Sequence, residues 1–168
     1  MKSLLMETTL PKEIAECLAT VTDPEIPVLT VLDLGVVRGV KQHPDGTLEV
    51  FITPTYTGCP AMRLIEMNIA AALHERGYEN VKVTTVLAPP WTTDWISEEG
   101  RRKLREFGIA PPQRGTAASE PFDEKAPVPC PRCGSHNTRL VSQFGSTACK
   151  SLFKCLDCLE PFDYFKCH

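Results

Sequence analysis

The spacing of hydrophobic and polar residues predicts a short helix followed by a hairpin near the start of the chain. Residues 11–21 carry apolar side chains at helical spacing. Residues 36–42 and 47–53 read as strands, and the HPDG turn at 43–46 lies between them. We therefore expect these two segments to pair as a β-hairpin.

The strongest helical pattern covers residues 60–76. Four apolar residues recur along it at spacings of three and four, as on the buried face of a helix: Met62, Ile65, Ile69 and Leu73. Gly77 is a natural C-terminal stop, because glycine adopts the left-handed conformation that ends many helices.

A further strand and a final helix complete this part of the chain. Residues 81–87 are strand-like, and Thr92 or Thr93 can cap a helix that runs to about Phe107. The order α, β, β, α, β, α predicts an α/β (α+β) domain over residues 1–108, in which a small three-stranded sheet packs with helices. A domain of this length is near the lower size for an independent hydrophobic core.

Composition changes sharply after this domain. Residues 109–129 contain five prolines and scattered charges, which is typical of an extended linker. Residues 130–168 hold six of the eight cysteines, and only Cys17 and Cys59 lie outside them. The sequence therefore predicts a second, separate module built on different principles.

Charge and hydropathy narrow the class of protein. The net charge of −3 disfavours a general nucleic-acid binder, which would need a basic excess. The N-terminal residues lack the apolar core of a signal peptide, and no apolar run reaches membrane-spanning length. We expect a cytoplasmic protein that binds neither nucleic acid nor membrane. In that reducing compartment, paired cysteines more often bind metal than form disulfides.

Two C-x-x-C pairs predict a zinc ribbon in the second module. The pairs are Cys130 with Cys133 and Cys155 with Cys158. Each pair can supply two thiolates from one tight turn, as tetrahedral zinc requires. Metal binding would also supply folding free energy to a module too small for a large core. Two disulfides are the competing interpretation.

Three residues of this module fall outside the predicted ligand set: Cys149, Cys167 and His168. They read as ordinary ribbon or tail residues. Because thiolate-rich sites also accept iron, recruitment of iron is the alternative.

Cys59 stands alone between a strand and the helix over residues 60–76, at the expected N-cap, with Pro60 as the first helical residue. At a helix N-terminus, backbone N–H groups and the helix dipole favour the thiolate, so we expect a lowered pKa. Such a thiol can be a nucleophile, a redox sensor or a metal ligand. A small buried hydrophobic residue at this junction is an equally good interpretation, and it is the preferred one for Cys17.

Other polar and aromatic residues have structural explanations. Asp23 and Glu25 read as capping residues of a turn or short helix. The RRKLR stretch at 101–105 is interleaved with acids at helical spacing, which favours a solvated, ion-paired face. Trp91 and Trp95 are four apart and read as core residues, with a docking surface as the alternative.

Three stretches together resemble a known family. The segments are DPEIPVLTVLDLGVVRGV from residue 23, TPTYTGCPA from residue 53, and APPWTTDWISEEGRRKLREFGIAPP from residue 88. The first two resemble the iron–sulfur-cluster assembly domain of SufT-type maturation factors. With the third and the cysteine ribbon, nearly the whole chain resembles the D components of bacterial phenylacetyl-CoA epoxidase systems, which serve phenylacetate degradation.

The resemblance implies a role for particular residues. The family's acidic D-P-E element falls on Asp23, Pro24 and Glu25, and its T-x-x-G-C-P element includes Cys59. It implies that Cys59, with Asp23 and Glu25, handles or transfers an iron–sulfur cluster. One cysteine cannot hold a cluster alone, so binding would be transient or shared with a partner.

The function implied is an accessory maturation protein rather than an enzyme. Its partners would be the epoxidase components, above all the iron–sulfur reductase, and the iron–sulfur assembly machinery. The chain has no Glu-x-x-His pair typical of di-iron oxygenases and no G-x-G-x-x-G nucleotide motif. The alternatives are a structural or coupling subunit of the epoxidase complex and a thiol-dependent enzyme that uses Cys59.

Overall fold

The computed structural model describes residues 10–56, 58–114 and 127–166. These residues form two compact units, which divide between Trp91 and Thr92 and are described separately below.

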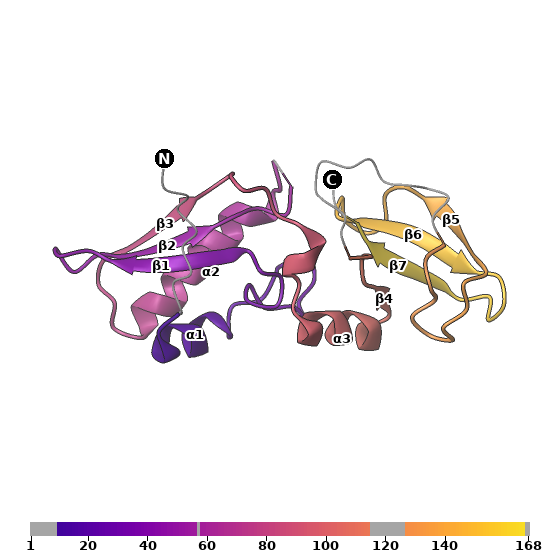
Figure 1. The fold of residues 1–168 in the computed structure, drawn as a ribbon, viewed down its shortest axis with the longest axis horizontal. Helices are drawn as coiled ribbons and strands as arrows, with labels where there is room; N and C mark the ends of the chain where they lie inside the picture. The colour runs from indigo at the N-terminus through magenta and orange to yellow at the C-terminus, as the bar shows by residue number, and fades with distance from the viewer. Residues whose placement is uncertain (1–9, 57, 115–126, 167–168) are drawn as a thin grey trace. The chain divides into compact units, whose positions relative to one another are not determined.

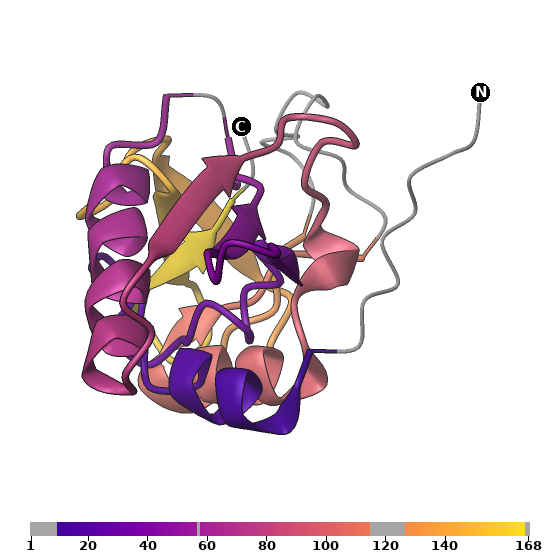
Figure 2. The same cartoon turned by 90° about the vertical axis from the view of Figure 1, so that its left-hand side faces the viewer.

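The first unit is a three-stranded sheet with two helices. Its elements are α1 (Lys12–Leu18), β1 (Val37–Gln42), β2 (Leu48–Ile52), α2 (Ala61–Glu75) and β3 (Val81–Thr85). The strands lie in the order β1-β2-β3, with β1 antiparallel and β3 parallel to β2. α2 is the crossover between the parallel strands, and α1 lies next to it (Figures 1 and 2). The predicted hairpin and the predicted α/β class are confirmed.

Buried residues of β2 and α2 make up much of the core of this unit. Leu48, Val50 and Ile52 alternate along β2 and are fully buried, because alternate side chains of a strand share one face. Three residues of the predicted helix face are also fully buried: Ile65, Ile69 and Leu73. Trp91 is buried too, and its indole Nε1 donates a hydrogen bond of 2.8 Å to the Leu34 carbonyl oxygen. Trp91 is therefore a core residue, as predicted.

The second unit contains the cysteine ribbon and more of the chain than expected. Its elements are the 3₁₀ turn η1 (Thr93–Trp95), α3 (Glu98–Phe107), β4 (Ile109–Ala110), β5 (Thr138–Ser142), β6 (Lys150–Cys155) and β7 (Pro161–Phe165). The sheet order is β4-β7-β6-β5.

This division differs from the predicted domain boundary after residue 108. β4 lies within the predicted linker, yet it pairs in parallel with β7 of the ribbon. Val128, near the other end of that linker, is buried in the ribbon core. β4 completes the sheet and core of the unit that holds the cysteines, and α3 contacts β4 within that unit.

The last helix begins later than the sequence suggested. Thr92 and Thr93 do not cap it; η1 intervenes, and Ser97 is the N-cap, whose Oγ accepts a hydrogen bond of 2.9 Å from the Gly100 N–H. Arg101 is an exception to the predicted solvated face. It is buried, and its guanidinium donates to the carbonyl oxygens of Thr93 and Pro112, both at 2.6 Å.

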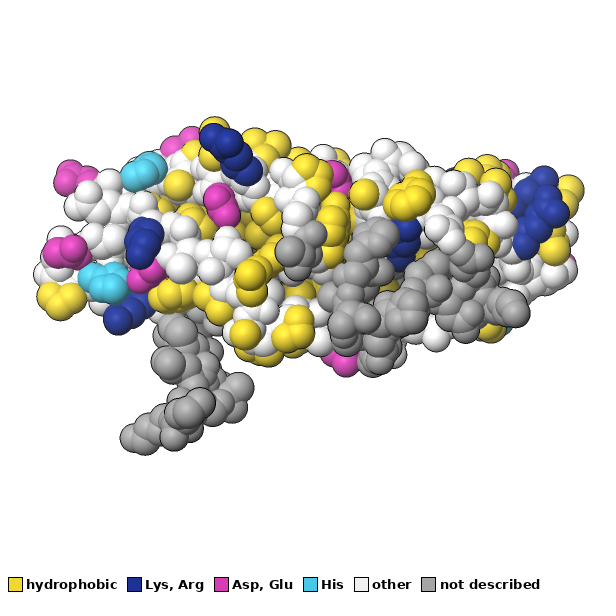
Figure 3. All heavy atoms as spheres, turned by 90° about the horizontal axis from the view of Figure 1, so that it is seen from above, with side chains coloured by type: hydrophobic (Ala, Val, Ile, Leu, Met, Phe, Trp, Pro, Cys, Tyr) yellow, Lys and Arg dark blue, Asp and Glu magenta, His cyan; other side chains and the backbone are white. Residues whose placement is uncertain are grey.

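Arg102 and Arg105 of that basic stretch are exposed as predicted, and Lys103 is half-buried. Arg102 is exposed and pairs with Glu99 and Glu106 on α3. On the face that Figure 3 presents, acidic and basic side chains of the described residues are interspersed. Among the residues that the structure describes, no helix is both long and apolar enough to cross a lipid bilayer.

The sheet face opposite the β2 core carries a buried acid, Glu49. Its carboxylate accepts a hydrogen bond of 2.6 Å from the Thr84 hydroxyl and pairs with Lys82 at 3.0 Å and His43 at 2.7 Å. These hydrogen bonds, led by the one from Thr84, lower the pKa of Glu49 to about 2. The carboxylate joins β2 to β3 and to the hairpin turn.

The pH dependence of Glu49→Gln tests this arrangement. A lowered pKa in the folded state stabilises the fold above the ordinary glutamate value of about 4, and that contribution is lost as pH falls through about 2. We expect Glu49→Gln to melt at a lower temperature than wild type at pH 7 and the difference to shrink between pH 4 and 2. Glu79→Gln, at an exposed position, is the matched control. A difference independent of pH would contradict the prediction.

Candidate thiol and metal sites

Cys59 lies in a tight turn that leads into α2. Its N–H donates to the Tyr56 carbonyl oxygen at 3.3 Å, and its own carbonyl oxygen accepts from the Met62 N–H at 3.2 Å. Gly58 allows the turn, because its φ of +86° is in the region that favours glycine. Pro60 and not Cys59 is the N-cap of α2, so Cys59 lies one residue before the cap, just outside the helix.

Asp23 and Glu25 lie in a turn and not at the start of a helix. The Asp23 Oδ1 accepts hydrogen bonds from the N–H groups of Glu25 at 2.7 Å and Ile26 at 2.8 Å. The Asp23 N–H donates to the Leu29 carbonyl oxygen at 2.8 Å, which closes the loop. Asp23 is 9% exposed. Its carboxylate caps the backbone N–H groups of this turn, which is the capping role that its sequence position suggests.

The fold places the Asp23 and Glu25 carboxylates near enough to the Cys59 thiol for their charges to act on its pKa, although more than 30 residues separate them in sequence. Burial is the largest effect on the thiol and raises its pKa above the ordinary value. Hydrogen bonds from the Ala61 N–H and the Tyr56 side chain lower this pKa, and the negative charges of Glu25 and Asp23 raise it further.

The expectation of a lowered Cys59 pKa is therefore wrong. The N-terminal end of α2 does donate to the sulfur, but half-burial and two neighbouring negative charges outweigh that donation. The thiol is protonated near neutral pH in the protein alone. A positive charge that neutralises the carboxylates would favour the thiolate, which is the form that binds metal.

Alkylation rates measured against pH test this electrostatic account. We expect the midpoint for Cys59 to lie above that of a free thiol. Glu25→Gln should lower the midpoint, because it removes a negative charge, and Tyr56→Phe should raise it, because it removes a hydrogen-bond donor. Alkylation of the Cys59→Ser protein measures the reaction of the other thiols, and this background is subtracted from the wild-type rate. A wild-type midpoint below the free value would restore the original expectation.

The second unit gathers four thiols at one point. The sulfurs of Cys130, Cys133, Cys155 and Cys158 all lie within 4.8 Å of one another. Cys130 and Cys158 are 3.8 Å apart at their sulfurs, and Cys133 and Cys155 are 3.6 Å apart. All described cysteines are free thiols, so the disulfide interpretation is not supported.

This geometry fits a single tetrahedral metal ion. Zinc–sulfur bonds of about 2.3 Å in a tetrahedron place neighbouring sulfurs about 3.8 Å apart, close to the spacing observed. Backbone donors already face the sulfurs: hydrogen bonds led by that from the Cys158 N–H lower the pKa of Cys155 to about 7. At Cys133 and Cys158, a backbone hydrogen bond is outweighed by desolvation and hydrogen bonds with the neighbouring thiols, so the pKa of Cys133 is raised and that of Cys158 is raised to about 12. These thiols would lose their protons as a cation binds.

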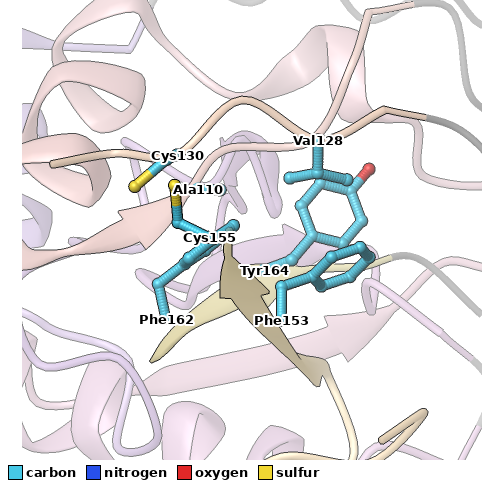
Figure 4. Packing of buried hydrophobic residues seen from close by; sticks show 7 residues of the cluster. All are labelled: Ala110, Val128, Cys130, Phe153, Cys155, Phe162 and Tyr164. Atoms are coloured by element: carbon cyan, nitrogen blue, oxygen red, sulfur yellow. The ribbon is translucent and has the colours of Figure 1, made fainter. Parts of the chain in front are cut away.

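An aromatic core lies beside Cys130 and Cys155, two of the four thiols (Figure 4). Phe153 stacks on Phe162 and contacts Tyr164 edge to face, with ring centroids 5.8 and 5.7 Å apart. Buried residues around these rings include Ala110 of β4 and Val128, as well as the ligand candidates Cys130 and Cys155. The ribbon therefore has an apolar core of its own, which the sequence analysis did not anticipate. The alternating aromatics of β7 are the signal that it overlooked.

The cysteines outside the two sites are Cys17, Cys149 and Cys167. Cys17 is buried in α1, as predicted, and burial raises its pKa. Cys149 is also buried, and its sulfur lies 3.1 Å from the Thr147 hydroxyl. Cys167 and His168 lie outside the described residues.

These sites define a two-part protein, an iron–sulfur-assembly type of α/β domain joined to a four-cysteine β-ribbon. Residues 11–87 match the family described as iron-sulfur cluster assembly protein, and residues 114–166 match the PaaD zinc beta ribbon domain. An Escherichia coli (strain K12) protein, named as a subunit of a "Putative 1,2-phenylacetyl-CoA epoxidase", is 49% identical over 155 residues, which cover 92% of each chain. The chain belongs to the PaaD family.

Other relatives match only the first part. A protein of Porphyromonas gingivalis (strain ATCC BAA-308 / W83) named Fe-S protein maturation auxiliary factor is 36% identical over 94 residues, which cover 55% of this chain and 89% of that protein. A crystal structure of a domain of unknown function, DUF59, from Bacillus anthracis superposes with a TM-score of 0.51 at 24% identity, over 55% of this chain and 88% of that one. That structure supports the fold of the first unit alone.

Proposed function

We propose that this protein is an accessory factor of a phenylacetyl-CoA epoxidase system, and that it assists assembly or insertion of the iron–sulfur cluster of the reductase component. It would act without oxidising the substrate itself, and its other partner would be the iron–sulfur assembly machinery. We place this activity in the cytoplasm, where the free thiols described above would stay reduced.

The observation that carries the proposal is that the charges of Asp23 and Glu25 act on the Cys59 thiol within an assembly-type domain. A relative of that domain is named as a maturation auxiliary factor, and a relative of the whole chain as an epoxidase subunit. Maturation of an iron–sulfur component within an epoxidase system is the function that accounts for both names.

The chemistry of the thiol supports a transient role. Cys59 is protonated while it stands beside two carboxylates, so it does not hold metal strongly by itself. An arriving cluster brings positive iron, which offsets the carboxylate charges and favours loss of the thiol proton. Since one thiolate is too few for a cluster, the remaining ligands would come from the donor or acceptor protein. Weak, shared ligation allows release as well as capture.

We infer that the ribbon ion is zinc, with Cys130, Cys133, Cys155 and Cys158 as its ligands. Four thiolates in a closed set with tetrahedral spacing favour structural zinc. The ligands of a cluster bind different iron atoms and would have to stand farther apart than these sulfurs do.

Metal content tests this assignment. We expect about one zinc ion per wild-type chain, because four thiolates complete the coordination shell. Cys133→Ser and Cys158→Ser should each lose zinc, as measured by elemental analysis, and should lower the melting temperature of the protein. Cys149→Ser is the matched control and should retain zinc. Undiminished zinc in both ligand variants would contradict the assignment.

Cys59→Ser tests the maturation role in cells that depend on this protein for growth on phenylacetate. Serine is close in size to cysteine, so the variant should keep its fold and its zinc, yet it offers no thiolate. We expect epoxidase whose reductase component lacks its iron–sulfur centre, measured by iron and sulfide content after purification, and slow or absent growth. Cys17→Ser is the control. A fully loaded reductase in Cys59→Ser cells would contradict the proposal.

A coupling subunit of the epoxidase is the second candidate, because the relative of the whole chain is named as a subunit. Epoxidase components with chemically reconstituted clusters separate the two functions when assayed with and without this protein. A maturation factor is dispensable once the clusters are in place. If turnover still requires this protein in fixed proportion, the coupling function is correct. The raised pKa of Cys59 gives the third alternative, a thiol enzyme, less support.

A further inference from the structure

The two cysteine turns of the ribbon are joined by a polar network outside the sulfur cluster. Asp157, between Cys155 and Cys158, accepts hydrogen bonds from two residues that follow the other turn. The Ser135 hydroxyl donates to its Oδ2, and the Asn137 Nδ2 donates to its Oδ1 at 2.8 Å. Both carboxylate oxygens of Asp157 are therefore occupied by the opposite turn.

Backbone bonds extend this network into both turns. The Ser135 carbonyl oxygen accepts from the Cys130 N–H at 2.9 Å, and the Ser135 hydroxyl also accepts from the Asn137 N–H at 3.0 Å. The Leu156 N–H donates to the Asn137 carbonyl oxygen at 2.8 Å. One continuous set of hydrogen bonds thus runs from the ligand candidate Cys130 to Leu156 and Asp157, which lie between the ligand candidates Cys155 and Cys158.

We propose that the Asp157 carboxylate, through Ser135 and Asn137, is a positioning group that holds the two cysteine turns in metal-binding register. This inference rests on the metal site proposed above. Asp157 does not touch the ion; it limits how far the Cys155 turn can swing from the Cys130 turn. A site arranged in advance loses less conformational freedom when the ion binds, so it binds more tightly.

The second turn has a particular need for this support. After Cys133, the first turn has Gly134 with a φ of +76°, a conformation that glycine adopts without strain. After Cys158, the equivalent position is Leu159, with a φ of +65° and a side chain 64% exposed. A leucine in this region is strained, so the second turn is the less stable of the two when no contact holds it. The bonds to Asp157 act on that turn.

Metal affinity and coordination geometry, measured together, test the inference. Full-length protein stripped of metal is titrated with Co²⁺, whose absorption spectrum reports tetrahedral thiolate ligands, and then with Zn²⁺ in competition. We expect Asp157→Ala to bind both ions about 10- to 100-fold more weakly than wild type. Ser135→Ala should show a smaller loss. Because the network is exposed to solvent, the zinc-loaded variants should melt close to wild type.

Glu160→Gln is the matched control. It removes one acidic charge two residues beyond Cys158, at an exposed side chain, and leaves the network in place. We expect it to bind Co²⁺ like wild type, within about twofold, since a surface charge alone contributes little. If Glu160→Gln weakens binding as much as Asp157→Ala, the effect is one of charge and the positioning role is wrong.

Two further outcomes would overturn the inference. Equal Co²⁺ affinity in wild type and a folded Asp157→Ala protein would remove the positioning role while leaving the metal site intact. A loss of melting temperature with unchanged affinity and spectrum would make Asp157 a purely structural residue. If Asp157→Ala does not fold, Ser135→Ala and Asp157→Asn decide by the same measurements. Wild-type protein that binds no Co²⁺ at the thiols would instead refute the metal site itself.

Discussion

The packing of α2 against the sheet is the interaction on which the candidate thiol site depends. β2 and α2 both bury an apolar face in the same core, so the end of β2 and the start of α2 are fixed relative to each other. Cys59 lies in the short connection between them, and its position follows from that packing. The loop that carries Asp23 and Glu25 is fixed by its own hydrogen bonds beside the same connection. The charges of two acids from a distant part of the chain thus act on this thiol.

The ribbon combines two sources of stability. Its hydrophobic core buries Phe153, Phe162 and Tyr164 together with Cys130 and Cys155. A metal ion would join the four sulfurs at the edge of that core. Hydrophobic burial holds the sheet, and ligation holds the turns. The two contributions meet at Cys130 and Cys155, which are both core residues and ligand candidates.

Local patterns predicted the regular elements well and the long-range relationships poorly. The helix over residues 60–76 and the hairpin before it follow from periodicity and turn residues, and both are present within a residue or two of the predicted bounds. The two C-x-x-C pairs identified the thiols that come together, because ligand spacing is itself a local signal. The pKa of Cys59 was predicted with the wrong sign, since burial and the charges of Asp23 and Glu25 depend on tertiary structure that no local pattern encodes. β4 was overlooked for a similar reason. Two residues beside prolines carry no strand signal until β7 is there to pair with them.

The pairing of β4 with β7 also shows that the proline-rich stretch begins inside the ribbon unit and not between two domains. With Ala110 held in the sheet, and Pro112 and Gln113 held by hydrogen bonds from Arg101 and Thr93, the stretch leaves one fixed point and returns to another at Val128. Both described ends of the stretch therefore belong to one compact unit. Residues 109–113 and Val128 are under the constraints of a packed core, so substitutions there would act on the stability of the ribbon itself.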